Sequence, residues 1–229
     1  MRAGLLARSV ALLAALSTRA VAAPAATTSD TPPADLVTAK PADATTLAAV
    51  MKLLAVTRLA ADFKEQKHSA LLARPLVTKG TLVYERERGL VRSVTAPRPH
   101  QVVVTPTTLT FRKGSRTETV PLAKSQDLKA FALVFPALLR GDRDEIARSF
   151  ELAVRGSAQD WWALTLTPKA ATLRKLITSV VVFGRGGEVR ELRVVEASGD
   201  HSEMTLSAIR TNGDVADSEL TGFGSAKAP

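Results

Sequence analysis

The side chains that could do chemistry in this sequence are few and scattered. Its three histidines are His68, His100 and His201. None of them stands at a metal-ligand spacing from another histidine or a carboxylate. Asp142, Asp144 and Glu145 cluster at the start of a predicted helix, where carboxylates stabilise the helix dipole without any catalytic role. These patterns predict neither a metal site nor an acid–base pair.

No motif for nucleophilic catalysis or phosphate binding is present. The sequence lacks a Gly-x-Ser-x-Gly elbow, and it has no cysteine, which excludes thiolate catalysis and disulfides. Gly184–Gly187 lies between two predicted strands and precedes no helix, so we interpret it as a hairpin turn. Trp161 and Trp162 are adjacent on a strand and face opposite ways, which disfavours a platform for stacking bases. We therefore expect no enzyme, no cofactor, no metal and no nucleic-acid partner.

The basic balance of the chain is modest and evenly spread. The formal net charge is +9, and such an excess can steer a protein toward phospholipid or nucleic acid. Because no run of five or more basic residues occurs, a solvated surface is the commoner explanation.

The first residues have the order of features expected of a secretory signal peptide, at residues 1–23. Arg2 and Arg8 precede a short apolar run, Val10–Leu16, which is too short to span a bilayer. The small residues Ala20–Ala23 offer a cleavage site. We therefore expect an exported protein.

Composition then divides the chain. Residues 24–45 are rich in Ala, Thr, Pro and Asp, which predicts a flexible linker. Residues 46–222 are expected to form one domain of ordinary size, and residues 223–229 a loose tail.

Most of the predicted domain has the rhythm of an antiparallel sheet. Leu82, Tyr84 and Arg86 share one face if their segment is a strand. A charged turn follows, and Leu90–Thr95 and Val102–Val104 continue a meander. From residue 149 onward the strand pattern returns at regular spacing, as in a sheet or barrel.

Two segments have helical spacing instead. Thr45 or Thr46 could cap an amphipathic helix over Leu47–Leu59. Ser125–Leu139 is apolar nearly all round, and Pro136 is expected to kink it or to split it into two short helices. Such a segment is typical of a lid over the concave side of a sheet and equally of a plain core helix. Asp142 can cap a further short helix.

Several segments together resemble the periplasmic lipoprotein carrier family LolA, and more closely its broad LolA-like relatives, over about Leu47–Gly213. The segments that carry the resemblance, in family order, are Phe63–Lys67, Gly80–Tyr84, Ala96–Pro99, Val102–Val104, Trp162–Ala170, Leu173–Val182, Val189–Val195 and Gly199–Asp200.

The resemblance implies a mainly β fold with some α: an open, strongly curved antiparallel sheet, or incomplete barrel, covered by an N-terminal helix and short mid-chain lid helices. It implies a periplasmic monomer that binds acyl chains of lipoproteins or related lipids in an apolar hollow. It also implies an inner-membrane donor complex and an outer-membrane acceptor as partners.

The resemblance further implies an arginine that holds the lid shut. Counting from Gly80, this residue is Arg86, with Arg88 as the alternative because the turn carries one extra residue. Ser93 stands where the family has tryptophan, and Gln66 lies one position late. These departures indicate a divergent paralog whose cargo is a lipoprotein or another lipid, such as a glycolipid.

The function expected on this basis is a carrier toward the outer membrane. The alternatives are a sensor of the same fold and the lipidated acceptor LolB, which the lack of cysteine disfavours. The candidate cavity and lid residues are Leu82, Tyr84, Arg86, Val91, Leu128, Phe131, Phe135, Leu138, Trp162 and Leu164. For each apolar member, plain core packing is as well supported as cavity lining.

Overall fold

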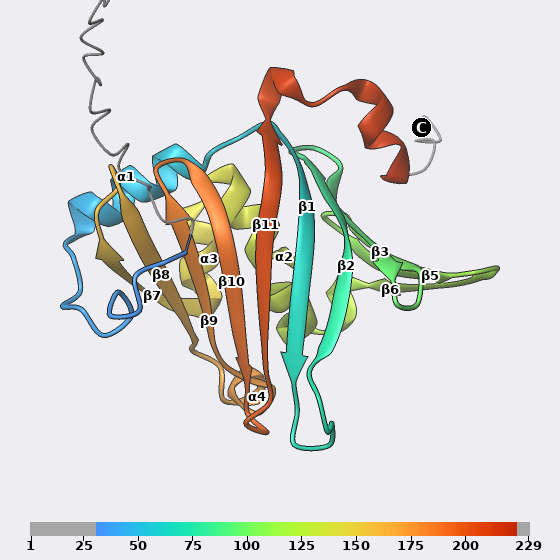
Figure 1. Ribbon diagram of the computed structural model, residues 1–229, viewed down its shortest axis with the longest axis horizontal. Helices are drawn as coiled ribbons and strands as arrows, with labels where there is room; N and C mark the ends of the chain where they lie inside the picture. Colours follow the sequence, from blue (N-terminus) through green and yellow to red (C-terminus); the bar gives the residue numbers. More distant parts are fainter. Residues whose placement is uncertain (1–30, 224–229) are drawn as a thin grey trace, which may run out of the picture. The chain divides into compact units, whose positions relative to one another are not determined.

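The computed structural model describes residues 31–223. The predicted signal peptide, the start of the predicted linker and residues 224–229 of the predicted tail lie outside the described residues. Within residues 31–223, eleven strands form one antiparallel sheet with the order β6-β5-β4-β3-β2-β1-β11-β10-β9-β8-β7 (Figure 1). This arrangement confirms the predicted fold class, a mainly β protein with an open sheet and a few helices.

The bounds of the elements are as follows. The strands are β1 (Arg58–His68), β2 (Leu76–Glu85), β3 (Gly89–Ala96), β4 (His100–Val104), β5 (Thr108–Lys113), β6 (Arg116–Pro121), β7 (Phe150–Gly156), β8 (Trp161–Pro168), β9 (Ile177–Arg185), β10 (Glu188–Glu196) and β11 (His201–Thr211). The helices are α1 (Ala44–Leu54), α2 (Gln126–Arg140), α3 (Arg143–Ser149) and α4 (Ala171–Arg174), with short 3-10 turns η1 (Leu122–Lys124), η2 (Asn212–Asp214) and η3 (Asp217–Phe223).

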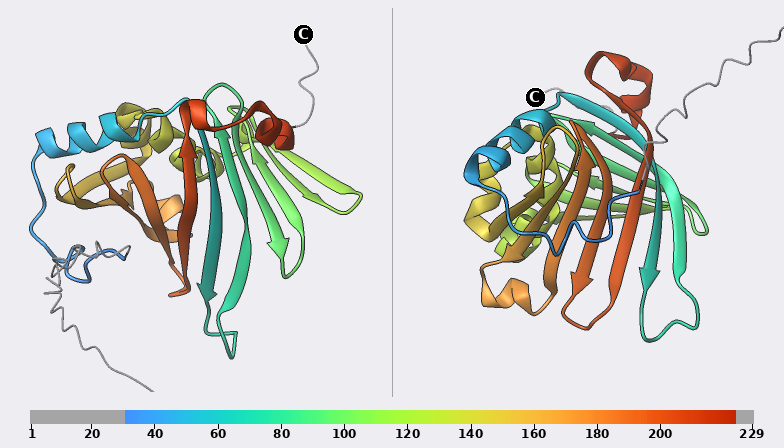
Figure 2. Two further views of the ribbon diagram at one scale, coloured as in Figure 1. Left: turned by 45° about the horizontal axis from the view of Figure 1, so that its top comes forward. Right: turned by 60° about the vertical axis from the view of Figure 1, so that its left-hand side comes forward.

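The sheet has two free edges, and the chain passes directly from one to the other. The edge strands β6 and β7 are consecutive in sequence, joined by η1, α2 and α3. The sheet curves so that α2 and α3 lie on its inner side (Figures 1 and 2). None of the helices in residues 31–223 is long and apolar enough to cross a membrane.

Helix α1 begins and ends earlier than the sequence predicts. Its cap is Asp43, whose carboxylate accepts a hydrogen bond from the Thr46 backbone N–H at 2.8 Å, so the predicted cap at Thr45 or Thr46 is wrong. The expected end at Leu59 is also wrong, because Arg58 already pairs with Glu85 in the sheet. The β-branched residues Val56 and Thr57 have a weak helical preference, and sheet pairing outweighs the stronger preference of Arg58 and Leu59.

Helix α2 is continuous through Pro136, so of the two predicted effects of this proline, a kink or a split, the split does not occur. Burial of the residues around Pro136, from Val134 to Leu139, stabilises the helix despite the missing backbone donor. Ser125 caps its start, and Gly141 ends it in the left-handed conformation at φ 70°. Asp142 caps α3 through the Glu145 N–H at 3.0 Å, as predicted.

The two faces of the sheet pack against different elements. We call the face toward α2 the inner face; it carries the main core cluster, which includes Trp162. On the outer face, Trp161 packs with Phe183 and Leu36. The two tryptophans therefore face opposite ways, as predicted. Because Leu36 is buried there, the stretch predicted as a linker contributes to the outer packing.

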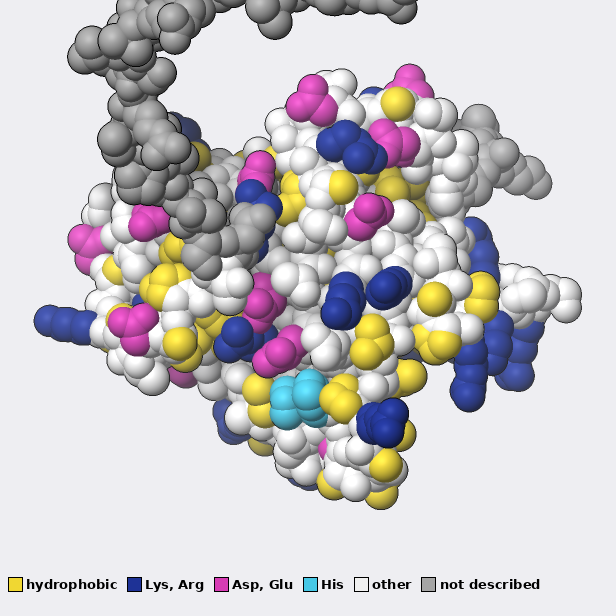
Figure 3. Space-filling view, in the orientation of Figure 1, with side chains coloured by type: hydrophobic (Ala, Val, Ile, Leu, Met, Phe, Trp, Pro, Cys, Tyr) yellow, Lys and Arg dark blue, Asp and Glu magenta, His cyan; other side chains and the backbone are white. Residues whose placement is uncertain are grey.

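The outer face is polar over much of its area. Figure 3 shows side chains of both charges dispersed over it, together with two adjacent histidines. These are His68 and His201, partners across β1 and β11, whose rings stack with centroids 4.6 Å apart. Sequence analysis treated them as isolated residues, and the sheet register brings them together.

Gly184, near the end of β9, offers a test of the packing around Trp162. A Cβ on Gly184 would lie 2.1 Å from the Trp162 ring and 2.6 Å from the Glu188 carbonyl oxygen. Overpacking of this kind costs about 1–3 kcal/mol. We expect Gly184→Ala to lower the free energy of unfolding by that amount, measured by urea unfolding followed by tryptophan fluorescence.

The matched control is Gly213→Ala, since a Cβ on Gly213 meets no atom within 4 Å. We expect this variant to unfold at nearly the wild-type urea concentration. Equal stabilities of the two variants would contradict the described packing.

Candidate functional site

The inner face of the sheet holds the candidate site, and α2 fills much of it. Side chains from the second half of the helix, including Phe135 and Leu138, are buried in the main core. The predicted cavity residues in the same cluster are Leu82, Tyr84, Trp162 and Leu164. These come from both halves of the sheet, so the fold brings six of the predicted site residues together around α2.

The first half of α2 is packed less completely. Leu128 is partly exposed and Phe131 is 42% exposed, and neither belongs to the main core cluster. On the sheet, Phe111 and Val120 pair with Val102 and Leu109, which pack on the core, so all share the inner face. Phe111 is 37% and Val120 39% exposed. Apolar surface is therefore exposed to solvent on the first half of α2 and on β5 and β6 at one edge of the sheet.

Two spaces of different size lie next to α2. A cavity of ≈ 20 Å³ lies between α2 and α3, lined partly by Val134 and Phe150, and this holds about one water molecule. A larger notch of ≈ 320 Å³ opens beside α2 and is lined by Arg86, Glu87, Pro106, Leu133 and Arg140. Among the described residues, the second half of α2 therefore occupies much of the inner face, and the larger notch lies at its side.

The two arginines considered for holding the lid shut, Arg86 and Arg88, lie in different surroundings. Arg86 donates from Nη2 to the Val56 carbonyl at 3.0 Å, in the connection between α1 and β1. The Val56 N–H in turn donates to the Leu139 carbonyl of α2 at 2.9 Å. Arg86 therefore reaches α2 through one intervening residue. Arg88 instead lies over the ring of Phe223, the last residue of η3, at 4.6 Å.

Val91 is the predicted cavity residue that the structure places elsewhere. It pairs with Val83, which packs with Ala60 and Leu220 in the cluster under η3. Its side chain lies next to Gly222, since a Cβ added to Gly222 would contact the Val91 side chain. Val91 is buried, but it faces away from α2. Because Leu90 and Val91 are consecutive and both apolar, the sequence pattern did not show which of them faces α2. The face that Val91 occupies is the outer face, which η3 covers.

The phenol group of Tyr84 lies among apolar side chains on the inner face of the sheet. Its side chain is fully buried, and its hydroxyl has no hydrogen-bond partner among the described residues. Burial raises the pKa of this phenol, and the nearby positive charges of Arg140 and Arg86 offset only part of that effect. The hydroxyl group is therefore kept neutral on the inner face near the notch.

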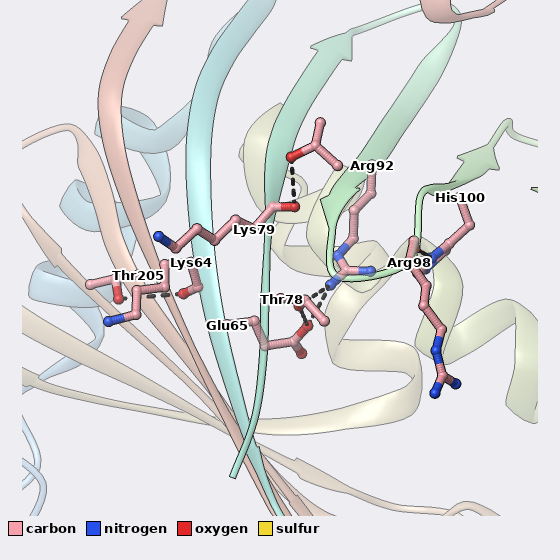
Figure 4. A network of polar contacts seen from close by, with 9 residues as sticks. Lys64, Glu65, Thr78, Lys79, Arg92, Arg98, His100 and Thr205 are labelled. Atoms are coloured by element: carbon pink, nitrogen blue, oxygen red, sulfur yellow. Dashed lines mark hydrogen bonds and ion pairs between the residues drawn. The ribbon is translucent and has the colours of Figure 1, made fainter.

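Sequence analysis missed a set of charged residues on the inner face. Glu65 and Arg92 form an ion pair across β1 and β3, although they are far apart in sequence (Figure 4). Alternation alone placed Glu65 on the same face as Phe63, which is a signal that could have been followed. No group of three or more metal-ligating side chains occurs within residues 31–223.

These features together define a class of protein: an open antiparallel sheet whose apolar inner face is occupied by an amphipathic helix linking its two edges. The chain belongs to the outer membrane lipoprotein carrier protein LolA-like family, whose model matches residues 38–222. A search of curated proteins found no match.

Several solved structures are similar at low identity. A DUF1329 family protein from Desulfovibrio piger is 12% identical, with 76% of this chain and 94% of that chain covered and a TM-score of 0.44. A LolA superfamily protein from Nitrosomonas europaea is 14% identical, with 79% and 97% covered and a TM-score of 0.41.

The Pseudomonas aeruginosa complex of MucA and MucB also matches, at 11% identity, with 77% and 59% covered and a TM-score of 0.42. These scores are too low to add to the assignment, which rests on the family model.

Tyr84 is the only tyrosine in the sequence, so tyrosinate absorbance reports on it alone. We expect its titration midpoint in the folded protein to lie above the value of about 10 for a free phenol. The folded state then keeps a proton that the unfolded state has lost. The free energy of unfolding should therefore be constant in this respect below pH ~10 and fall as the pH rises further.

Tyr84→Phe is the matched control, because it retains the ring and removes the titrating group. Its alkaline loss of stability should be shallower than that of the wild type. A midpoint at or below that of free tyrosine would contradict the burial of this hydroxyl.

Proposed function

We propose that this protein is a periplasmic carrier that binds acyl chains of lipoproteins or related lipids on the inner face of its sheet. In this proposal it takes cargo from an inner-membrane donor complex and passes it to an outer-membrane acceptor, acting as a monomer. Membership of the LolA-like carrier family supports the proposal. The predicted signal peptide, which lies outside the described residues, is consistent with it.

The observation that carries the proposal is the unequal packing of α2. Its second half is buried in the core, whereas Phe131 in its first half is 42% exposed. Apolar surface on β5 and β6 is exposed as well. A helix held at one end and loosely packed at the other can be displaced by a ligand that covers the same apolar surface.

The energetics favour such an exchange over a permanently open cavity. Each CH₂ transferred from water contributes about 0.8 kcal/mol, so a cargo with several long chains would gain tens of kcal/mol, far beyond a useful affinity. If α2 must leave the inner face first, its lost burial offsets much of this gain. Net affinity then stays low enough for release to an acceptor.

Arg86 is proposed to stabilise the closed arrangement through Val56. A hydrogen bond from a charged donor contributes about 1.5–3 kcal/mol, so its loss should favour displacement of α2. We expect Arg86→Leu to bind a fluorescent fatty acid roughly tenfold more tightly and to release it more slowly to acceptor vesicles.

Arg88→Leu is the control, since Arg88 contacts η3 on the outer face and should leave fatty-acid binding unchanged. Unaltered uptake and release in Arg86→Leu would rule out the latch.

The cargo is tested by purifying the protein from the periplasm of its host and extracting bound molecules for mass spectrometry. We expect co-purifying lipids or acylated peptides. Acylated peptides would indicate a lipoprotein carrier, and lipids alone a carrier or sensor of another lipid, such as a glycolipid. A protein that is empty after purification, and that also fails to bind added fatty acid, would contradict the proposal.

A further inference from the structure

Charged residues cross the inner face where its apolar surface ends. Along β1, Phe63 is followed on the same face by Glu65 and Lys67, and along β10 Val194 is followed by Glu196. Lys67 donates to Glu196 at 2.6 Å. With Thr78 of β2 and Arg92 of β3, these residues form what we call the polar belt: Glu65, Lys67, Thr78, Arg92 and Glu196.

Arg92 is the centre of the polar belt and is only partly satisfied. Its side chain is 20% exposed and that of Glu65 22%. Nη2 donates to Glu65 Oε2 and, at 3.5 Å, to Thr78 Oγ1 (Figure 4). Its Nε is buried without a hydrogen-bond partner among the described residues.

The surroundings of Arg92 act on its charge in opposite directions, because a ring face attracts a cation whereas burial disfavours it. Its guanidinium lies over the Phe63 ring at 4.5 Å. Burial lowers the pKa of Arg92, against the opposing effect of Glu65. A buried donor is rarely left unpaired in a folded protein.

A buried ion pair is weak evidence for a role in stability, because well-packed apolar residues in its place are often as stable or more so. The position suggests another role. Arg92 pairs with Leu82 across β2 and β3, and Leu82 is part of the core under α2. A lipid whose tails replaced α2 would bring its polar end to the belt.

We propose that the polar belt is a binding site for a zwitterionic phospholipid headgroup, a phosphate joined to an ammonium group. The phosphate oxygen would accept from Nε of Arg92, a geometry suited to guanidinium groups. The ammonium would lie against the carboxylates of Glu65 and Glu196. A purely anionic headgroup fits less well, because Arg92 and Lys67 already balance the two carboxylates of the polar belt, and a headgroup without net charge leaves that balance unchanged. This inference rests on the proposed function.

The test is competitive loading of the full chain. The protein is incubated with detergent-solubilised phosphatidylethanolamine, phosphatidylglycerol and diacylglycerol of identical acyl chains in equal amounts, and the bound lipids are quantified by mass spectrometry. We expect phosphatidylethanolamine in roughly tenfold excess over diacylglycerol, the discrimination typical of one charge-assisted hydrogen bond. Equal loading, or a preference for phosphatidylglycerol, would overturn the headgroup site while leaving the proposed carrier function standing. Absence of any loading would overturn both.

Variants connect the preference to the polar belt. The double variant Glu65→Leu/Arg92→Leu removes the pair without leaving a lone buried charge, and it should load all lipids alike. Arg92→Lys keeps the positive charge but has no Nε donor, so it should also lose most of the preference. A preference that persisted in both folded variants would contradict the assignment.

The matched control is the pair formed by Arg210 and Glu219 on the outer face. The variant Arg210→Gln/Glu219→Gln should keep the wild-type preference. Circular dichroism and thermal unfolding of each variant would separate a loss of preference from a loss of fold.

Discussion

Apolar side chains from the second half of α2 pack against strands from both halves of the sheet. The helix supplies Phe135 and Leu138, and the sheet supplies Tyr84 on one side and Trp162 on the other. Without the helix, this inner face would expose a continuous apolar surface, which soluble proteins rarely tolerate. The burial of α2 is therefore the constraint that holds a strongly bent, unclosed sheet in a stable form.

Other features of the fold support this packing. The end of α2 is fixed where Gly141 adopts a left-handed conformation close to α1, since a Cβ there would lie 2.7 Å from the Met51 carbonyl oxygen. The chain of hydrogen bonds from Arg86 through Val56 to Leu139 holds the same end. The beginning of the helix is capped by Ser125, but Phe131 in its first half is 42% exposed. The two ends of α2 thus differ in how firmly they are held.

The sequence predicted what depends on local pattern. Strand alternation located Leu82 and Tyr84 on one face, and the cap at Asp142 was evident from residue type alone. Where both faces of the sheet are covered, the sequence did not predict which face a residue such as Val91 occupies. Alternation of apolar and polar residues carries no information there, because each face is buried. The pairing of Glu65 with Arg92 and of His68 with His201 depends on sheet register between distant segments. No local pattern encodes that register, so these contacts required the structure.

The order of the strands has a mechanical consequence. The strands β6 and β7 are neighbours in sequence, yet they form the opposite edges of the sheet. The segment between them therefore spans the gap across which the two edge strands of a closed barrel would be hydrogen-bonded. Because α2 belongs to the segment that joins both edges, a displacement of α2 would act on both edges together. Under the proposed carrier function, a single segment would therefore control both the access of cargo to the inner face and the spacing of the two edges.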